Sequence, residues 1–300
     1  MLVLTRAEVE ELLDLDALVE ALASAHAELS AGRASLPPRV AAFTERGLLG
    51  AMPGYVEGAG LGAKLVSLFP QNRPPVPTHQ AAIALFDETT GMLTAIMDGT
   101  YITAVRTAAA AALATRLLAR ADAKVLSILG TGAQSRAAQQ IFPRVHAFTE
   151  VRVAGRGEYE DAVRGADVVH AATHSAEPIV LAEWLAPGAH VSSVGYNAPG
   201  SELDPAIVER ADVVCIESRA SALAPPPAGA PELAGVDPDA VVEIGEIVAG
   251  TRPGRTSGDQ LTLYKSVGVA VQDLAAAALV LRAAKERGVG REIELEEVPA

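Results

Sequence analysis

Two glycines separate an apolar run from a helix-like segment near the middle of the chain. Residues 124–129 have the length of a strand, and residues 136–141 have the pattern of a helix. A strand, a glycine turn and a helix in this order suit a dinucleotide, because glycines allow close backbone approach and the free N–H groups of the helix start bind phosphate. The predicted phosphate-binding residues are Gly130, Thr131, Gly132, Ala133 and Gln134. Ser135 replaces the third glycine of the usual G-x-G-x-x-G pattern, so a tight connection without a ligand is the alternative.

Two basic residues, Lys64 and Arg106, each interrupt an apolar stretch of the chain. An unpaired charge at such a position would be costly, so both side chains point to a functional role. The alternative, an ordinary surface charge, suits Arg39 better than it suits these two. His79 could shuttle protons or form a structural hydrogen bond, and the sequence favours neither role. The six histidines and one cysteine show no metal-ligand spacing, so we expect no metal.

The composition favours a soluble, cytoplasmic protein. Half of the 300 residues are apolar, and 37 acids against 24 bases give a net charge of −13. This charge argues against nucleic acid or a membrane as partner, because both attract basic patches. The single cysteine, Cys215, forbids an internal disulfide and lies in an apolar run where we expect a buried, inert thiol. We expect neither a signal peptide nor a membrane-spanning segment of about 18 apolar residues.

The first hundred residues predict a helix pair followed by an antiparallel sheet. Thr5 precedes the first helical pattern, and Asp14 and Asp16 interrupt it before a second one. Alternating apolar runs with glycine and proline punctuation predict the strands. The expected elements are helices over 6–13 and 17–30, strands over 39–52 and 62–69, a hairpin over 81–97 and an alanine-rich helix over 103–120.

From residue 124 the pattern changes to short apolar strands that alternate with helices. The expected strands are 124–129, 151–154, 167–172, 190–194 and 212–216, followed by a proline-rich loop over 221–235 and a final helix over 267–287. This spacing predicts a parallel, doubly wound sheet.

Several segments, in order along nearly the whole chain, resemble the ornithine cyclodeaminase/mu-crystallin family of nicotinamide-dependent enzymes. They are residues 77–80, 96–99, 103–107, 130–134, 199–204, 266–268 and 272–273. The resemblance implies an α/β protein with a Rossmann-type doubly wound domain over 116–267. It also implies a discontinuous α+β domain, 1–115 with 268–300, which binds substrate and forms a homodimer through its sheet.

The resemblance implies that Arg39, Lys64 and Arg106 bind the carboxylate of a small amino or imino acid, with Thr78 at the same site. That carboxylate must be fixed while the neighbouring carbon exchanges a hydride, and an arginine fork with a second cation supplies the orientation. Lys64 is the expected proton donor, because burial among arginines should lower its pKa. On the cofactor side, the resemblance adds Arg156, Thr173, Val194, Gly195, Ser266, Val267 and Gly268.

The first departure from the family pattern concerns an aspartate that handles the substrate amine in cyclodeaminating members. Asn197 is nearest to that place in this chain, so it is the second expected catalytic residue. An amide can hydrogen-bond an imine or amine but cannot take its proton. Asp204 could substitute, although Asp204 followed by Pro205 is more typical of a helix N-cap.

The second departure is the short segment between Arg156 and Gly165. The family has a longer stretch there, so the Rossmann half is expected to lack one α/β unit. The strand over 151–154 ends near Arg156 with no acid at its tip, which favours NADP, with NAD possible. Glu158 lies close enough in sequence to compete for the ribose.

Three functions follow from these features. The first is an NAD(P)-dependent oxidoreductase that interconverts an α-imino acid, often a cyclic ketimine, and an α-amino acid. The second is an ornithine or lysine cyclodeaminase, which the amide at Asn197 disfavours. The third is a non-catalytic small-ligand binder like mu-crystallin, which would have no need of the three cations if its ligand were neutral.

Overall fold

The computed structural model describes residues 1–195, 200–225 and 228–295, and it divides into two compact units. Unit 1 comprises residues 1–106 and 270–300, and unit 2 comprises residues 107–269. The sequence places the corresponding boundaries at 115/116 and 267/268. The long helix α3 (Thr100–Leu118) begins in unit 1 and ends in unit 2.

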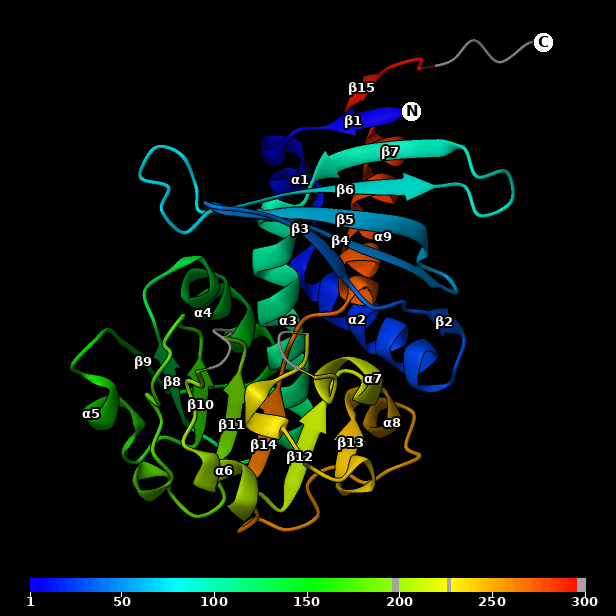
Figure 1. Ribbon diagram of the computed structural model, residues 1–300. Coiled ribbons are helices and arrows are strands. Elements are labelled where there is room, and N and C mark those ends of the chain that lie inside the picture. The colour runs from blue at the N-terminus through cyan, green and yellow to red at the C-terminus, as the bar shows by residue number, and fades with distance from the viewer. Residues whose placement is uncertain (196–199, 226–227, 296–300) are drawn as a thin grey trace. The chain divides into compact units, whose positions relative to one another are not determined.

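In unit 1 the described residues form an eight-stranded, mainly antiparallel sheet with the order β15-β1-β7-β6-β5-β4-β2, and β3 also pairs with β4 (Figure 1). The strands are β1 (Leu2–Leu4), β2 (Ala34–Ser35), β3 (Val40–Thr44), β4 (Gly47–Val56), β5 (Gly60–Leu68), β6 (His79–Phe86), β7 (Leu93–Asp98) and β15 (Arg291–Glu292). The helices are α1 (Arg6–Leu12), α2 (Leu15–Ser30) and α9 (Ala270–Arg287). Helix α9 packs against β4, β5 and β6 and against α2.

In unit 1 the expected start of α1 after Thr5 is confirmed, whereas α2 begins at Leu15, two residues earlier than expected. Thr5 and Glu8 form a capping box, and Asp14 caps α2 by accepting from the N–H groups of Asp16 and Ala17. The alternation in β4 and β5 buries one face, including Met52, and leaves the other face exposed.

The expected single strand over 39–52 is wrong, because a turn divides it into β3 and β4. The Thr44 hydroxyl accepts hydrogen bonds from the backbone N–H groups of Arg46 and Gly47, at 3.2 and 3.1 Å. This local bond competes with a continuous ladder, as threonine side chains do at turns. The register then pairs Val40 with Ala51 and Phe43 with Leu48.

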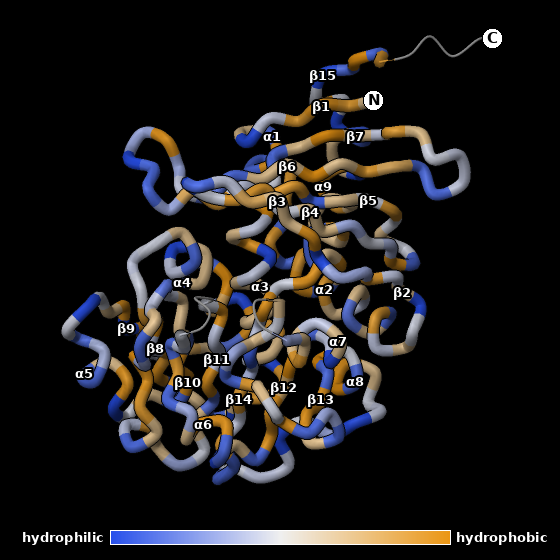
Figure 2. The backbone as a smooth tube through the Cα atoms, viewed as in Figure 1, coloured by the Kyte–Doolittle hydropathy of each residue, from blue (hydrophilic) through white to orange (hydrophobic). Residues whose placement is uncertain are grey.

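Unit 2 contains a parallel seven-stranded sheet with the order β13-β12-β14-β11-β10-β8-β9. The strands are β8 (Val125–Leu129), β9 (Glu150–Ala154), β10 (Val168–Ala171), β11 (His190–Ser193), β12 (Val213–Ile216), β13 (Val241–Glu243) and β14 (Thr262–Lys265). The helices are α4 (Ala133–Val145), α5 (Tyr159–Val163), α6 (Pro205–Arg210), α7 (Arg219–Ala222) and α8 (Ile244–Val248), with short 3₁₀ turns at Ala182–Trp184, Pro231–Leu233 and Pro238–Ala240. Hydrophobic residues of several strands, including β8, β10 and β12, contribute to the core of this unit (Figure 2).

The doubly wound sheet is confirmed, and β9 is one of its two edge strands. The chain leaves β9, forms the five-residue helix α5 and enters β10 on the other side of β8. In the usual order 3-2-1-4-5-6, β9 takes position 2 and β10 position 4, so position 3 has no strand in this fully described segment. The short stretch after Arg156 predicted this arrangement.

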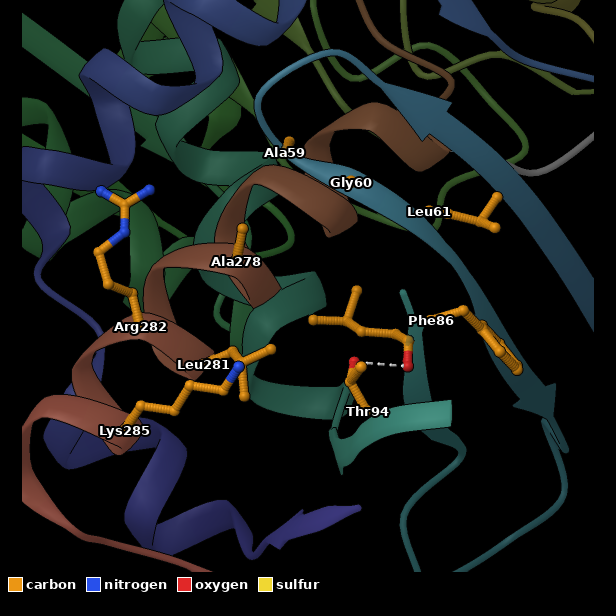
Figure 3. A pocket seen from close by; sticks show the side chains of 10 residues that line it. Ala59, Gly60, Leu61, Phe86, Thr94, Ala278, Leu281, Arg282 and Lys285 are labelled. Atoms are coloured by element: carbon orange, nitrogen blue, oxygen red, sulfur yellow. Dashed lines mark hydrogen bonds between the residues drawn. The ribbon is translucent and has the colours of Figure 1, made fainter. Parts of the chain in front are cut away.

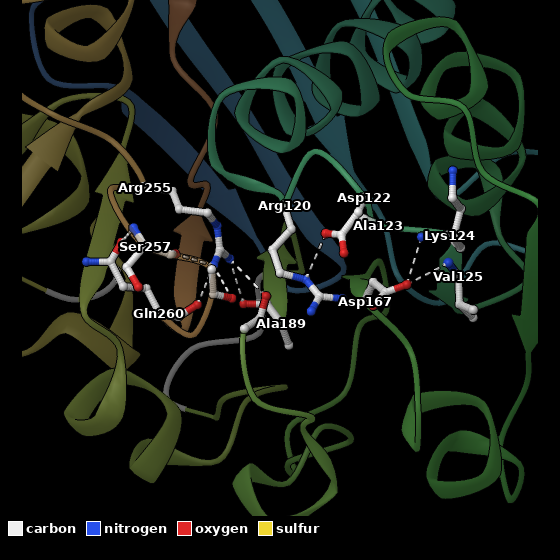
Figure 4. A network of polar contacts seen from close by, with 12 residues as sticks. Arg120, Asp122, Ala123, Lys124, Val125, Asp167, Ala189, Arg255, Ser257 and Gln260 are labelled. Carbon is white, nitrogen blue, oxygen red and sulfur yellow. Dashed lines mark hydrogen bonds and ion pairs between the residues drawn. The ribbon is translucent and has the colours of Figure 1, made fainter.

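Neither β13 nor β14 was predicted from the sequence, and β14 lies between β11 and β12 at the centre of the sheet. Its four residues begin and end with polar side chains, Thr262 and Lys265, although all four are buried. Arg255 links the start of β14 to neighbouring segments of the unit (Figure 4). It donates to Thr262 Oγ1 and to the carbonyl groups of Leu118, Gly188 and Gln260. Buried polar residues can occupy a central strand when every such group has a partner.

The final helix begins at Ala270, three residues later than expected. Gly268 has a φ of +71°, a left-handed conformation that a helix does not continue through. Cys215 is buried, as expected. Over the described part of the chain, no helix has the length and apolarity that a bilayer crossing requires, and no cluster of three or more His, Cys, Asp or Glu could hold a metal ion.

We expect the protein to lose stability as the pH falls below about 6.5. Burial lowers the pKa of His26, His170 and His190 to about 3, so all three are neutral in the folded protein. Between pH 6.5 and about 3 the unfolded chain binds the extra protons, and the free energy of unfolding must therefore fall on acidification. The upper bound is about 1.4 kcal/mol per pH unit for each histidine.

Urea unfolding at pH 7 and pH 5 measures this dependence. The midpoint should be lower at pH 5, and the variant His190→Gln, which cannot titrate, should show a shallower dependence. A midpoint that does not fall between the two pH values contradicts the neutral, buried state of these histidines.

Candidate active site

Lys64 is a buried cation on the inner face of the sheet in unit 1. Lys64 lies on β5 opposite Met52 of β4 and Ile83 of β6. Its side chain is 2% exposed, and its ammonium is 2.8 Å from Asp273 Oδ2. Asp273 belongs to the first turn of α9, which packs on this face. An aspartate therefore compensates the lysine inside an otherwise apolar layer.

The same aspartate holds a second cation, Arg106 of α3. The Nε of Arg106 donates to Asp273 Oδ1 at 2.9 Å, and its NH1 nitrogen donates to the side-chain oxygen of Gln272. Arg106 is 4% exposed and Asp273 is fully buried. Two cations against one carboxylate leave the cluster with one positive charge in excess. A buried excess charge is costly, so the cluster is suited to receive an anion.

Burial lowers the pKa of Lys64 to about 8. The positive charge of Arg106 lowers this pKa further, Asp273 opposes the shift, and Arg39 adds a smaller lowering effect. A lysine with this pKa exchanges its proton near neutral pH, as a general acid or base requires. The lowered pKa of Lys64 agrees with the sequence expectation.

The other predicted substrate residues, Arg39 and Thr78, are less buried than this cluster. Arg39 is exposed and directly precedes β3, where the alternation puts it on the same face as Met52 and Lys64. Thr78 is exposed, and its carbonyl accepts from the N–H of Phe69 at 2.8 Å. The pKa of His79 is lowered by burial first and then by Lys64 and Arg106, so His79 is neutral near pH 7.

A cavity of about 300 Å³ in unit 1 is separate from these residues (Figure 3). Its lining includes Leu61, Phe86 and Leu281, with Arg282 and Lys285 of α9 at its edge. The hydroxyl of Thr94 in its wall already donates to the carbonyl of Leu85 at 2.9 Å. None of the predicted catalytic residues lines this cavity, so it is not the candidate site.

In unit 2 the glycine turn has the geometry of a phosphate cradle. Gly130 has a φ of +118°, and a Cβ there would lie 2.6 Å from the carbonyl oxygen of Ala172, so this position requires glycine for the fold. Gly132 is the N-cap of α4 and provides no side chain to cap the helix. A Cβ at Gly132 would meet no atom within 4 Å, which leaves open space beside the helix start. The side-chain oxygen of Gln134 is buried without a partner among the described residues. The uncapped helix start and the open space at Gly132 fit a dinucleotide pyrophosphate, whose oxygens accept from N–H groups, whereas the Gln134 oxygen is itself an acceptor and adds nothing to this fit.

Two buried glutamates that the sequence analysis did not assign hold the loops at the carboxyl ends of the strands. Glu202 accepts from the N–H and hydroxyl of Thr173, the hydroxyl of Ser193 and the N–H of Gly195. A Cβ at Gly195 would lie 2.3 Å from the Glu202 carboxylate, which explains the glycine. Glu202 lies within residues 199–204, one of the segments that resemble the family. The hydrogen-bond partners of Glu202 are distant in sequence, and no local pattern reveals them.

Glu217 plays the same part for the loop after β14. Its carboxylate accepts from the Ser266 hydroxyl and from the N–H groups of Val267 and Gly268, at 3.1 and 2.9 Å for the two N–H groups. These donors, like those of Thr173 and Gly195, are already used within the protein. The hydrogen bonds to Glu202 and Glu217 therefore shape the edge of the sheet where doubly wound folds bind cofactors.

At the tip of β9 the structure places two opposing charges. Glu158 accepts from the N–H of Gly155 at 3.0 Å, and Arg156 is exposed. Asn197 lies outside the described residues. Asp204 is an N-cap, as expected: its carboxylate accepts from the N–H groups of Ala206 and Ala182, at 3.0 and 3.1 Å.

The comparisons with known proteins agree with this arrangement. The sequence model of the ornithine cyclodeaminase/mu-crystallin family matches residues 1–160 and 153–288. The mouse ketimine reductase mu-crystallin is 39% identical over 257 residues, which are 78% of this chain and 80% of the mouse protein.

Two solved structures share the whole fold. The Δ¹-pyrroline-2-carboxylate reductase of Thermococcus litoralis, in complex with NADH and L-proline, is 31% identical with a TM-score of 0.88. It covers 98% of this chain and 100% of its own. An archaeal alanine dehydrogenase dimer with bound NAD is 31% identical with a TM-score of 0.89, over 99% of both chains.

We expect Gly132→Val to lower the affinity for NADH and NADPH at least tenfold. The branched side chain would fill the open space at the start of α4, where phosphate must approach the backbone. Thermal stability should fall by only a few degrees, because the new atoms meet no others in the protein. Isothermal calorimetry and a thermal melt measure the two effects.

Gly130→Ala is the matched comparison. It should destabilise the protein strongly, since it combines the positive φ with the approach to Ala172. Unchanged cofactor affinity in a well-folded Gly132→Val variant would show that the turn is only a structural connection.

Proposed function

Because the chain belongs to the ornithine cyclodeaminase/mu-crystallin family, we propose that it is a nicotinamide-dependent oxidoreductase that interconverts an α-imino acid and an α-amino acid. The observation that carries this proposal is the buried cluster of Lys64, Asp273 and Arg106, with its excess positive charge. A relative with NADH and L-proline, the T. litoralis reductase, supports the substrate class.

The substrate carboxylate supplies the charge that the cluster lacks. Asp273 and Gln272 fix two nitrogens of Arg106, and the remaining terminal nitrogen has no protein partner among the described residues. That nitrogen and the Lys64 ammonium are the donors for the carboxylate. Both are held in place before the substrate arrives, which favours an oriented substrate.

The reaction needs one hydride and one proton. A bound nicotinamide cofactor would supply the hydride for the imine carbon, so that the C=N double bond is reduced to a single bond. Lys64 is the proton donor to the nitrogen, because its pKa of about 8 keeps it protonated at neutral pH and still able to release the proton. In the direction of amine oxidation, the same residue takes the proton back.

Cyclodeamination is the second candidate, and the structure supports it less. It needs a carboxylate near the substrate amine, whereas Asp204 is occupied as an N-cap and Asp273 as the partner of two cations. We therefore propose that ammonia release from ornithine and lysine is weak or absent. A non-catalytic binder of a neutral ligand would not need a buried excess of positive charge.

We also propose that the protein is a homodimer that uses the outer face of the sheet in unit 1. This face exposes Leu49, Leu61 and Leu65, which are 51%, 36% and 45% exposed. Apolar patches of this kind mark association surfaces. The archaeal alanine dehydrogenase of the same fold is a dimer.

We expect Arg106→Ala to lower kcat/KM for an imino acid such as Δ¹-pyrroline-2-carboxylate by about tenfold or more. The reason is the loss of a charge-assisted hydrogen bond to the carboxylate, which contributes roughly 1.5–3 kcal/mol. The decrease of NAD(P)H absorbance measures the rate. Arg116→Ala, on the same helix but exposed, is the control and should retain activity.

An uncharged amide analogue of the substrate should react poorly with the natural protein and be indifferent to Arg106→Ala. Full activity of Arg106→Ala on the imino acid would remove Arg106 from the site. Efficient ammonia release from ornithine or lysine would instead identify a cyclodeaminase.

For the cofactor we propose that Arg156 favours NADP by pairing with the 2′-phosphate, while Glu158 opposes it. Arg156→Ala should weaken NADPH binding about tenfold, the value of a charge-assisted contact, and leave NADH binding nearly unchanged. Glu158→Gln should shift the ratio in the opposite direction. Fluorescence titration of both cofactors measures the ratio, and tighter NADH than NADPH binding in the natural protein would refute the proposal.

A further inference from the structure

Behind Arg106 a chain of two more side chains leads into the core of unit 1. Gln272 of α9 accepts from Arg106 NH1 through its side-chain oxygen. The Nε2 nitrogen of Gln272 lies 3.1 Å from Nε2 of His26 on α2. Gln272 and His26 are both fully buried. The three side chains come from three different helices, so the contact chain joins α3, α9 and α2.

The chemistry of these groups permits one orientation of the amide. A guanidinium can only donate hydrogen bonds, so the oxygen of Gln272 must face Arg106. The amide nitrogen, which also only donates, must then face His26. His26 therefore has to present a lone pair at Nε2 and carry its hydrogen on Nδ1. A protonated His26 would place an N–H against the amide N–H and break the chain.

The surroundings of His26 support this state. Burial and the positive charge of Arg106 both lower its pKa, so His26 stays neutral. Its Nδ1 is buried without a partner among the described residues. A buried polar atom without a partner costs stability. Because the protein keeps His26 here despite the cost at Nδ1, its contact with Gln272 at Nε2 calls for an explanation beyond packing.

We propose that His26 and Gln272 are positioning residues, which set the rotation of the Arg106 guanidinium so that its free nitrogen meets the substrate carboxylate. Asp273 alone would fix only the Nε of Arg106. Gln272 fixes a second nitrogen, and His26, by accepting from the Gln272 amide nitrogen, holds the amide in the orientation that faces its oxygen to the arginine. The role in substrate binding rests on the proposed function, whereas the tautomer and the amide orientation do not.

The part that is independent of activity is tested by nitrogen NMR of the histidine rings in the natural protein. We expect His26 to show a protonated Nδ1 and an unprotonated Nε2 throughout pH 6–8. A proton on Nε2, or titration of His26 in this range, would overturn the contact chain whatever the protein catalyses.

The part that rests on the proposed function is tested by kinetics with Δ¹-pyrroline-2-carboxylate. His26→Leu removes the acceptor and should raise KM about fivefold, the effect of one neutral hydrogen bond, with kcat changed less than twofold. His26→Gln keeps an acceptor oxygen and should restore KM. His190→Leu is the matched control, since His190 is equally buried and neutral but lies in unit 2, and it should leave KM unchanged.

Gln272→Met, which keeps the length of the side chain and removes both contacts, should raise KM as much as His26→Leu does. Gln272→Met also tests the positioning role if His26→Leu does not fold. Equal KM values for folded His26→Leu or Gln272→Met and the natural protein would overturn the positioning role. Absence of any imine reduction in the natural protein, with the expected tautomer present, would count against the proposed function and leave the contact chain standing.

Discussion

The fold and the proposed chemistry of unit 1 both depend on the carboxylate of Asp273. It lies fully buried between the Lys64 ammonium and the Arg106 guanidinium, at 2.8 and 2.9 Å. Without it, two cations would be buried with no compensating charge, a situation that costs several kcal/mol. With it, the cations remain charged and one positive charge is left over. The contact with Asp273 thus offsets the cost of burying two cations, and the positive charge that remains favours binding of an anion.

Unit 2 uses buried carboxylates in a different way. Glu202 and Glu217 accept from backbone N–H and hydroxyl groups of the loops that follow β10, β11 and β14. Charge-assisted hydrogen bonds of this kind are stronger than neutral ones, so they fix the conformation of these loops. The glycine turn, in contrast, keeps an uncapped helix start and open space at Gly132. The protein thus fixes the surroundings of the cofactor site and leaves the helix start free for phosphate.

Local patterns in the sequence predicted a large part of this structure. Neighbouring residues predicted the glycine turn, the helix caps at Thr5 and Asp204, and the strands from β8 to β12. Lys64 and Arg106 could be singled out because each interrupts an apolar stretch. The resemblance to the family supplied the proposed role of both residues and the expected two-part fold.

What the sequence did not predict depends on contacts between distant residues. Asp273 is 167 positions from Arg106, and nothing near it in the sequence shows that it compensates two cations. The insertion of β14 between β11 and β12 depends on partners for Thr262 and Lys265 that come from Arg255, Ser193 and Glu232. The turn at Arg46 was missed because the apolar pattern continues on both sides of it.

The central claim is that the cluster of Lys64, Asp273 and Arg106 carries an excess positive charge that a substrate carboxylate neutralises. Titration of the Lys64 ammonium by NMR, with and without saturating L-proline, tests it most directly. The account requires a pKa of about 8 in the free protein and a higher pKa with L-proline, because an added negative charge favours the protonated amine. L-prolinamide, which lacks the carboxylate, should not raise it. An ordinary lysine pKa in the free protein, or the same pKa with and without L-proline, would contradict the account.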